Sequence, residues 1–316
     1  MNIAFLFPGQ GSQSVGMGKA LFEQFELARG VFEEAENVLG WDVADLCFNG
    51  PESKLNQTEF TQPALLTTSI AAWRVLGSPI HSATLVAGHS LGEFTALVAA
   101  GALSFADAVR LVHLRGQFMQ EAVPEGKGAM AAIIGMKREA VEAICAQVSM
   151  DSALVSPANY NGPSQIVLSG EINAVKRAMV LAKESGAKLA IQLAVSVPSH
   201  SPLMRKACLR LSDELDKISG LDLQKPLVNN LAAEVTETWK VAKSALVDQL
   251  SSPLLWHETM TRMKDAGVDQ FIEVGPGRVL CGLLKRIDRR AKVMPVEDPE
   301  GIEKALSLLN QKVESV

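Results

Sequence analysis

The segment Gly88-His89-Ser90-Leu91-Gly92 constrains the fold of this chain more than any other feature. An apolar, β-prone run precedes it at 84–87, and a helix-prone run follows at 93–100. A strand, a Gly-x-Ser-x-Gly turn and a helix in this order form a nucleophile elbow, which presents a reactive serine. Glycines fit because so tight a turn leaves no room for Cβ atoms. We expect backbone N–H groups at the helix start to face the serine oxygen; the alternative is a glycine-rich turn that holds a serine.

Strand and helix patterns alternate on both sides of this turn, which predicts a parallel α/β sheet. The apolar run 3–7 predicts a buried strand, and further strands are expected at 84–87, 227–228 and 271–274. Apolar residues at helical spacing predict helices over 62–76, 104–122, 202–218, 241–250, 254–266 and 279–287. The second of these begins with Ser104 and Asp107 in the pattern of a capping box.

The middle of the chain has a different order of elements. Strands are predicted at 128–134, 153–155, 165–168 and 188–195, with helices at 137–148 and 172–185. The order β-α-β-β-α-β is that of a ferredoxin-like unit. We therefore expect a ferredoxin-like subdomain at 126–197, inserted into an α/β domain made of 1–125 and 198–316, with a cleft between the two.

Composition excludes several classes of protein. The 316 residues include 47% hydrophobic residues, enough for a sizeable core, and the net charge of −5 argues against a nucleic-acid partner. The four cysteines are far apart and form no C-x-x-C pair, so neither a metal site nor a disulfide framework is indicated. The start lacks the pattern of a signal peptide, and no run is long enough to span a membrane. We expect a cytoplasmic monomer that binds no membrane.

A serine nucleophile needs an adjacent base, and His200 is the best placed of the five histidines. It lies between two prolines where the chain leaves the inserted unit, a rigid mount for a general base; the alternative is an incidental imidazole at a helix cap. His89 is a poor base because consecutive side chains of the elbow point apart. His81, His113 and His257 are expected on the surface or in structural roles. No acidic residue stands in a diagnostic position, so a Ser–His pair oriented by a neutral group is as plausible as a full triad.

Arg115 interrupts the apolar stripe of the helix 104–122. Its position on the core-facing side requires an anion, because an unpaired buried guanidinium costs several kcal/mol. The partner is either an internal Asp or Glu, in a structural ion pair, or the carboxylate of a ligand held by two parallel N–H···O bonds.

Three further segments give weaker indications of function. The loop 7–13 follows the first strand and should face the cleft, but Gly16 is followed by Met17, not Lys, so it is not a P-loop. Gly275-Pro276-Gly277 lacks the third glycine of a dinucleotide-binding turn. A basic cluster is either a solvated face or a site for phosphates or an acidic partner; it comprises Lys285, Arg286, Arg289, Arg290 and Lys292.

Six motifs in one order resemble the malonyl-CoA:acyl carrier protein transacylases of bacterial type II fatty-acid synthesis. They span nearly the whole chain: Phe7-Pro8-Gly9-Gln10-Gly11-Ser12-Gln13, Gly88-His89-Ser90-Leu91-Gly92-Glu93, Arg115-Gly116-x-x-Met119-Gln120, Val197-Pro198-Ser199-His200, Gln249-Leu250-x-x-Pro253-x-x-Trp256 and Glu273-Val274-Gly275-Pro276-Gly277. The resemblance implies a hydrolase-like α/β domain with a ferredoxin-like insertion. Ser199 departs from the Phe that malonyl-selective modular synthases carry there, so their selectivity rule does not apply.

The resemblance also implies roles for single residues. Ser90 would be the acylated nucleophile, His200 its base, and Arg115 the partner of the malonyl carboxylate. Among the substrate-binding positions, the backbone N–H groups of Gln10 and Leu91 would form the oxyanion hole, and the main-chain carbonyl of Gln249 would orient the histidine. Asn159 and Asn161 match an Asn-x-Asn pair with no assigned role.

The activity expected from these features is transfer of malonyl from malonyl-CoA to the phosphopantetheine thiol of acyl carrier protein, through a malonyl-serine intermediate. Neither a metal nor another cofactor is expected. Two alternatives are a thioesterase, in which water resolves the acyl-enzyme, and a non-catalytic protein that docks the carrier.

Overall fold

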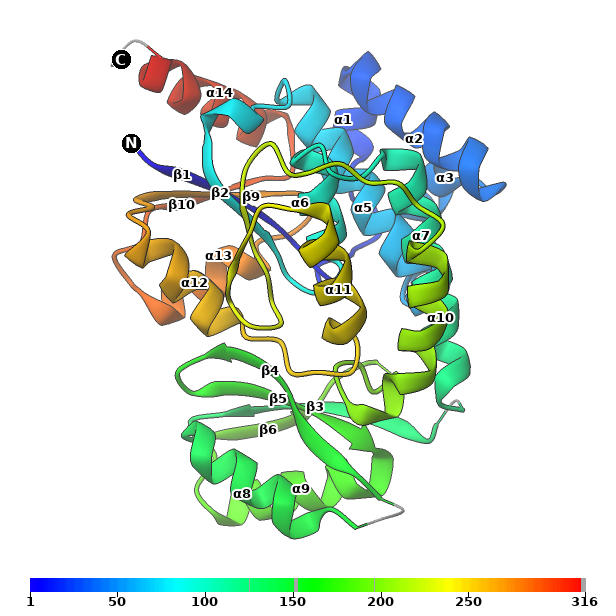
Figure 1. Ribbon diagram of the computed structural model, residues 1–316, viewed down its shortest axis with the longest axis vertical. Helices are drawn as coiled ribbons and strands as arrows, with labels where there is room; N and C mark the ends of the chain where they lie inside the picture. The colour runs from blue at the N-terminus through cyan, green and yellow to red at the C-terminus, as the bar shows by residue number, and fades with distance from the viewer. Residues whose placement is uncertain (125, 151–152, 196, 314–316) are drawn as a thin grey trace.

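Two sheets organise the chain (Figure 1). The structure is a computed structural model that describes residues 1–124, 126–150, 153–195 and 197–313. The larger sheet has the strand order β10-β9-β1-β2-β7-β8. Its strands are β1 (Ile3–Phe7), β2 (Ala83–Gly88), β7 (Leu227–Val228), β8 (Val235–Thr236), β9 (Gln270–Val274) and β10 (Val293–Val296). All neighbours pair in parallel except β7 and β8, which confirms the predicted parallel core.

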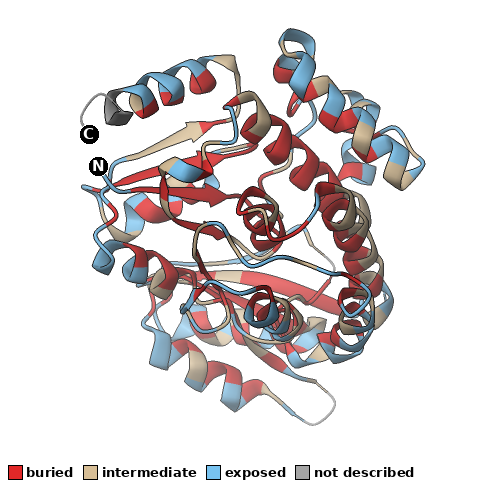
Figure 2. Cartoon of the chain, turned by 45° about the horizontal axis from the view of Figure 1, so that its top comes forward, coloured by how far each residue is buried: buried red, intermediate tan, exposed pale blue. Residues whose placement is uncertain are grey.

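Helices cover both faces of this sheet, so its central strands are buried throughout (Figure 2). Alternation along β1 divides the core: Ile3, Phe5 and Phe7 belong to one hydrophobic cluster, whereas Ala4 and Leu6 belong to another. The helices around the sheet are α1 (Lys19–Gln24), α2 (Glu26–Leu39), α3 (Val43–Asn49), α4 (Glu52–Leu55), α5 (Thr58–Val75), α6 (Gly92–Ala99), α7 (Phe105–Ala122), α10 (Arg205–Leu215), α11 (Trp239–Gln249), α12 (Trp256–Asp265), α13 (Val279–Ile287) and α14 (Pro299–Val313), with 3-10 turns η1 (Ile80–Ser82) and η2 (Pro202–Met204).

The smaller sheet is antiparallel, in the order β4-β5-β3-β6. Along the chain its part reads β3 (Gly128–Ile134), α8 (Arg138–Val148), β4 (Val155–Gly162), β5 (Gln165–Glu171), α9 (Ile172–Glu184) and β6 (Leu189–Gln192). Figure 1 shows α8 and α9 on the side turned away from the larger sheet. Ala129, Ala131 and Ile133 of β3 pack with these helices, whereas Met130 joins a small cluster on the other face. That second face is directed toward the larger part of the protein.

Strand β4 differs most from the sequence-based expectation of 153–155. It begins at Val155 and runs to Gly162; residues 151–152 lie outside the described part of the chain. Pro157 and the polar side chains obscure the strand pattern, and an edge strand tolerates both. The strand also contacts the larger part, because Tyr160 donates its backbone N–H to Leu254 over 2.9 Å.

Other differences concern element ends. Helix α5 begins at Thr58 and continues through Pro63, although 62–76 was expected. Pro63 lacks the N–H that would bond the carbonyl of Glu59, and His113 Nδ1 bonds that carbonyl instead, at 2.9 Å. The expected helix 202–218 divides into η2 and α10, and the expected strand 188–195 is confined to β6. Helices α1–α4 and α14 and strands β8 and β10 were not predicted. No helix among the described residues is long and apolar enough to cross a membrane.

Candidate active site

The strand-to-helix turn between β2 and α6 has the steric constraints expected of a nucleophile elbow. Ser90 has a φ of 53°, in the left-handed region that non-glycine residues rarely adopt. A Cβ on Gly88 would lie 1.8 Å from the backbone carbon of Gly92. A Cβ on Gly92 would lie 2.1 Å from the carbonyl oxygen of Phe7. Both flanking positions therefore require glycine, and β1 packs directly against the turn.

His200 lies opposite this serine. Its Nε2 is 2.8 Å from Ser90 Oγ, and its Nδ1 is 2.8 Å from the main-chain oxygen of Gln249. A carbonyl oxygen only accepts, so Nδ1 carries the proton and Nε2 presents its lone pair to the hydroxyl. His200 also has a positive φ of 57° and donates its own N–H to Leu250 over 3.0 Å. The end of α11 thus fixes the orientation of the imidazole without an acidic residue.

Burial and the nearby Arg115 cation lower the pKa of His200 to about 3. The carbonyl of Gln249 opposes this shift only in part, because a dipole stabilises an imidazolium less than a carboxylate would. The imidazole is therefore neutral, and free to accept a proton, throughout the physiological range.

Arg115 is 1% exposed and reaches the same point from α7. Its Nη2 donates to Ser90 Oγ and to Gln249 Oε1, both over 3.2 Å, and its Nη1 donates to Gln62 Oε1 over 2.8 Å. All three acceptors are neutral, and Nε is buried without a hydrogen-bond partner in the part of the chain that the structure describes. Among the described residues no carboxylate lies within ion-pair distance of this guanidinium, which disfavours the structural ion pair. Burial lowers the pKa of Arg115 to about 10, so it remains a cation at neutral pH.

These groups meet in a cavity of about 180 Å³ between the two sheets. Gln10 and Leu91 line it, and no acceptor of the described residues pairs with either backbone N–H. The apolar wall comes from the free face of the smaller sheet, the segment after β6 and the start of α13: Met130, Val167, Leu193, Val195, Val279, Leu280 and Leu283. Gln249 is fully buried and does not line the cavity. It therefore contacts Arg115 and His200 from the side that faces away from the cavity.

The other histidines lie away from the reacting atoms or face different partners. His89 turns its Nε2 to Asn161 Oδ1, 2.9 Å away on β4, and burial keeps its pKa low. Asn159 also lines the cavity. His113 bonds the backbone of α5, as described above. His81 and His257 lie in η1 and α12, outside the cavity.

Three residues that the sequence analysis did not assign complete the site. Asn230 accepts the backbone N–H of Ser90 over 2.8 Å, Gln62 fixes Nη1 of Arg115, and Glu93 bonds Gln249. Asn230 follows β7, at the edge where ligands of parallel sheets bind, so its position could have indicated it. Gln62 is a polar residue in an apolar helix, and Glu93 is an acid that follows the elbow.

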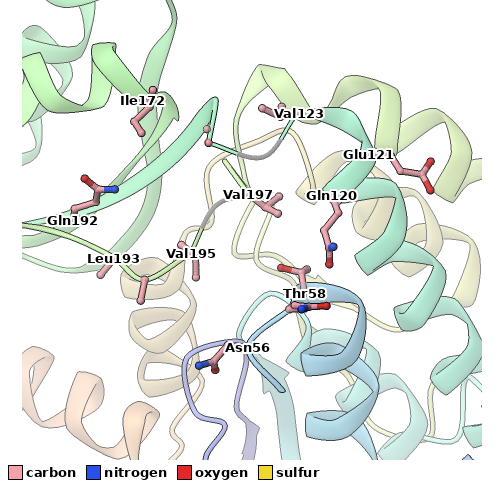
Figure 3. A pocket seen from close by; sticks show the side chains of 14 residues that line it. Asn56, Thr58, Gln120, Glu121, Val123, Ile172, Gln192, Leu193, Val195 and Val197 are labelled. Atoms are coloured by element: carbon pink, nitrogen blue, oxygen red, sulfur yellow. The ribbon is translucent and has the colours of Figure 1, made fainter. Parts of the chain in front are cut away.

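A larger cavity of about 700 Å³ lies next to the site (Figure 3). Leu193 and Val195 line both cavities, so the segment after β6 separates them. Polar side chains from the α4–α5 connection and α7 point into the larger space, among them Asn56, Thr58 and Gln120. Since neither Ser90, His200 nor Arg115 borders it, the chemistry belongs to the smaller cavity.

The basic cluster is exposed at the end of α13 and beyond, close to the cavity mouth. Arg286 donates to Gln165 Oε1, and Gln165 lines the site. Within the described part of the chain, no group of three or more His, Cys, Asp or Glu side chains could hold a metal ion.

A parallel α/β fold with a serine on a strained turn, a hydrogen-bonded imidazole and two free N–H groups defines a class: enzymes that pass an acyl group through a serine ester. The profile of the acyl transferase domain matches residues 4–301. The malonyl CoA-acyl carrier protein transacylase of Bacillus subtilis is 48% identical over 98% of both chains, and that of Escherichia coli K12 is 45% identical over 96% of this chain and 99% of its own.

Solved structures agree with these sequence matches. The transacylase of Coxiella burnetii superposes with a TM-score of 0.94 at 43% identity, over 98% of both chains. A malonyl-transacylase in complex with a type II PKS acyl-carrier protein gives 0.94 at 46% identity, over 98% of this chain and 100% of that one. The chain belongs to the family of malonyl CoA-acyl carrier protein transacylases.

Proposed function

We propose that this protein transfers malonyl from malonyl-CoA to the phosphopantetheine thiol of an acyl carrier protein, in support of fatty-acid elongation. One observation supports this most directly: the buried Arg115 guanidinium donates to Ser90 Oγ yet pairs with no carboxylate of the described residues. An acyl group esterified to Ser90 would extend along this cation. A carboxylate on that acyl group would supply a counter-charge in direct contact, with two charge-assisted bonds available.

In the first half-reaction the oxygen of Ser90 attacks the thioester carbonyl as His200 Nε2 accepts the hydroxyl proton. The tetrahedral intermediate collapses by breaking the carbon–sulfur bond, and the proton on His200 passes to the departing sulfur of coenzyme A. The products are malonyl-Ser90 and the free thiol, with the imidazole neutral again.

The second half-reaction reverses these steps with a different thiol. The phosphopantetheine thiol gives its proton to His200 as its sulfur attacks the ester carbonyl. The intermediate then expels the Ser90 oxygen, which takes back that proton. Because one base serves both steps, the two thiol substrates use the same site in turn.

Gln10 and Leu91 are proposed to stabilise the oxyanion of each intermediate. Their backbone N–H groups border the cavity beside Ser90, and Leu91 stands at the start of α6, where the helix dipole adds positive potential. Gln249 is proposed to hold His200 in its tautomer through the main-chain carbonyl.

The proposed architecture is a hydrolase-like domain, 1–125 and 198–316, with a ferredoxin-like subdomain at 126–197. The element order β3-α8-β4-β5-α9-β6 supports it, although boundary residue 125, residue 196 and the C-terminal residues lie outside the described ranges.

All site groups come from one chain, which supports a monomer. Side chains and backbone groups of the protein are proposed to perform every step, so the mechanism calls for no cofactor. Four free cysteines fit the cytoplasm.

Coenzyme A is proposed to enter along α13. Val279, Leu280 and Leu283 line the site from the first turns of this helix, and the exposed basic cluster follows at its other end. The phosphates of the nucleotide are the groups that such a cluster attracts.

Intact-mass measurement tests the proposal. Malonyl-CoA alone should add one malonyl group to the protein with stoichiometric release of coenzyme A, and adding carrier protein should remove it. Ser90→Ala should abolish labelling while the circular dichroism spectrum is retained. Continuous release of coenzyme A without carrier would indicate a thioesterase instead, and failure of the wild-type protein to become labelled would indicate a non-catalytic carrier-binding protein.

A further inference from the structure

Glu93 is a buried acid that the mechanism above does not use. It lies in the first turn of α6, three residues after the nucleophile, and is 1% exposed. Its Oε2 accepts a hydrogen bond from Gln249 Nε2, and its Oε1 accepts the backbone N–H of Asn230 over 3.3 Å. A carboxyl group held inside a protein in this way has a large desolvation cost, so its charge state matters to its neighbours.

The side-chain amide of Gln249 connects this acid to Arg115. A guanidinium can only donate, so the amide oxygen of Gln249 must face Nη2 of Arg115, at 3.2 Å. The amide nitrogen is then left to donate to Glu93. The amide dipole therefore lies between a cation and an anion, with its oxygen toward Arg115 and its nitrogen toward Glu93. This alignment favours the ionised form of Glu93.

The remaining titratable groups around the site supply no competing charge. Arg115 of α7 is the cation whose field opposes the rise in the pKa of Glu93. Burial lowers the pKa values of His89, on the elbow, and His200, before η2, so both are neutral. Burial also raises the pKa of the Cys208 thiol of α10, the group near Arg115, so this thiol is uncharged as well. Arg115 and Glu93 are therefore the charges that balance here.

Building on the proposed function, we propose that ionised Glu93 is an internal counter-charge of Arg115, acting through Gln249 and not by direct contact. In this form it opposes the malonyl carboxylate at the guanidinium, and it takes up a proton from solvent as malonyl binds. Two carboxylates near one cation repel each other, so ionised Glu93 weakens malonyl binding and bound malonyl favours protonated Glu93. An acetyl group has no carboxylate and is indifferent to this charge. Glu93 is thus a positioning residue that tunes acyl selectivity.

Burial raises the pKa of Glu93 to about 8. This value sets the pH range in which the effect of Glu93 on acyl selectivity is measurable. Below this pH the acid is mainly protonated and Arg115 is open to malonyl, and above it the acid is ionised. The malonyl carboxylate itself is ionised throughout. The ratio of kcat/KM for malonyl-CoA to that for acetyl-CoA should therefore fall between pH 6.5 and 9. A decrease of about fivefold or more corresponds to the lower end of typical couplings between two ligands.

Single-turnover labelling of Ser90 with each acyl-CoA measures this ratio, and groups common to both reactions cancel. Glu93→Gln should give a ratio that does not change with pH and exceeds that of the wild type at pH 9. Glu273→Gln is the matched control, because Glu273 is also fully buried but bonds the N–H groups of Leu280 and Cys281; this variant should keep the wild-type profile. A Glu93→Gln ratio that falls like the wild type would overturn the proposal.

Calorimetry of the wild-type protein in two buffers of different ionisation enthalpy gives a readout that needs no variant. At pH 8, labelling by malonyl-CoA should take up a larger fraction of a proton than labelling by acetyl-CoA. Equal uptake, together with a ratio independent of pH, refutes the role of Glu93 and leaves the proposed function intact. If malonyl-CoA does not label the protein at all, the proposed function itself fails.

Discussion

Replacing Arg115 with alanine should reduce malonyl transfer far more than acetyl transfer. The guanidinium donates to Ser90 Oγ, so its loss affects acylation by either substrate. Only malonyl also loses a carboxylate partner. The change in the malonyl-to-acetyl ratio therefore isolates the contribution of that ion pair from the general contribution of Arg115 to the nucleophile.

The size of this change follows from the donors that remain free. Two charge-assisted bonds contribute about 1.5–3 kcal/mol each, and about 1.4 kcal/mol corresponds to a factor of ten. The two bonds together would change the ratio by about a hundredfold or more, and a single bond by at least about tenfold. Truncation also leaves Gln62 Oε1 and Gln249 Oε1 without their donor, which costs about 1–3 kcal/mol of stability for each buried group.

The assay compares kcat/KM for the two acyl-CoA substrates at one pH, after thermal unfolding has shown that the variant is folded. Arg110→Ala is the matched control, because Arg110 lies on the same helix but pairs with Glu214 at the surface. Its ratio should equal that of the wild type. An unchanged ratio in Arg115→Ala would show that the guanidinium does not hold the malonyl carboxylate, and the proposed selectivity would have to be abandoned.

Three further outcomes are expected. Acylation should show no decline from pH 7 to pH 5, because an imidazole whose pKa is about 3 stays neutral above that value; an inflection near 6.5 in single-turnover rates would contradict this. Gly92→Ala should destabilise the protein by about 3 kcal/mol or more in urea, whereas Gly282→Ala on α13, where a Cβ meets nothing within 4 Å, should be neutral or stabilising. Ser104→Ala should cost about 1 kcal/mol through loss of the α7 cap, and an unchanged midpoint would contradict that role.

The turn around Ser90 could be predicted from sequence because its constraint is local. The strand, the two glycines and the helix act within about a dozen residues, and steric limits leave few alternatives. Arg115 could be predicted for a related reason: one helix fixes which residues share a face, so a charged residue within an apolar stripe is conspicuous. The second inference rests on the helical period of 3.6 residues.

The contacts between distant segments could not be predicted in this way. Asn230 bonds Ser90 across 140 positions, and Gln249 bonds Glu93 across 156. Such pairs depend on the strand order of the larger sheet, which places β7 beside β2, and no local pattern encodes that order. The same reason explains β4, whose length is set by pairing with β5 and by contact with Leu254.

The neutral orienting group behind His200 suits exchange between thiols better than hydrolysis. Burial and the nearby Arg115 cation keep the imidazole a weak base, and the Gln249 carbonyl opposes them only in part. In the second half-reaction a thiol, whose pKa is near 8.5, gives up its proton to such a base more readily than water does, since the pKa of bulk water is about 15.7. The apolar wall of Met130, Val167 and Leu193 further disfavours ordered water beside the ester. A site built in this way retains malonyl-Ser90 until a second thiol arrives, which is the property that separates a transferase from a thioesterase.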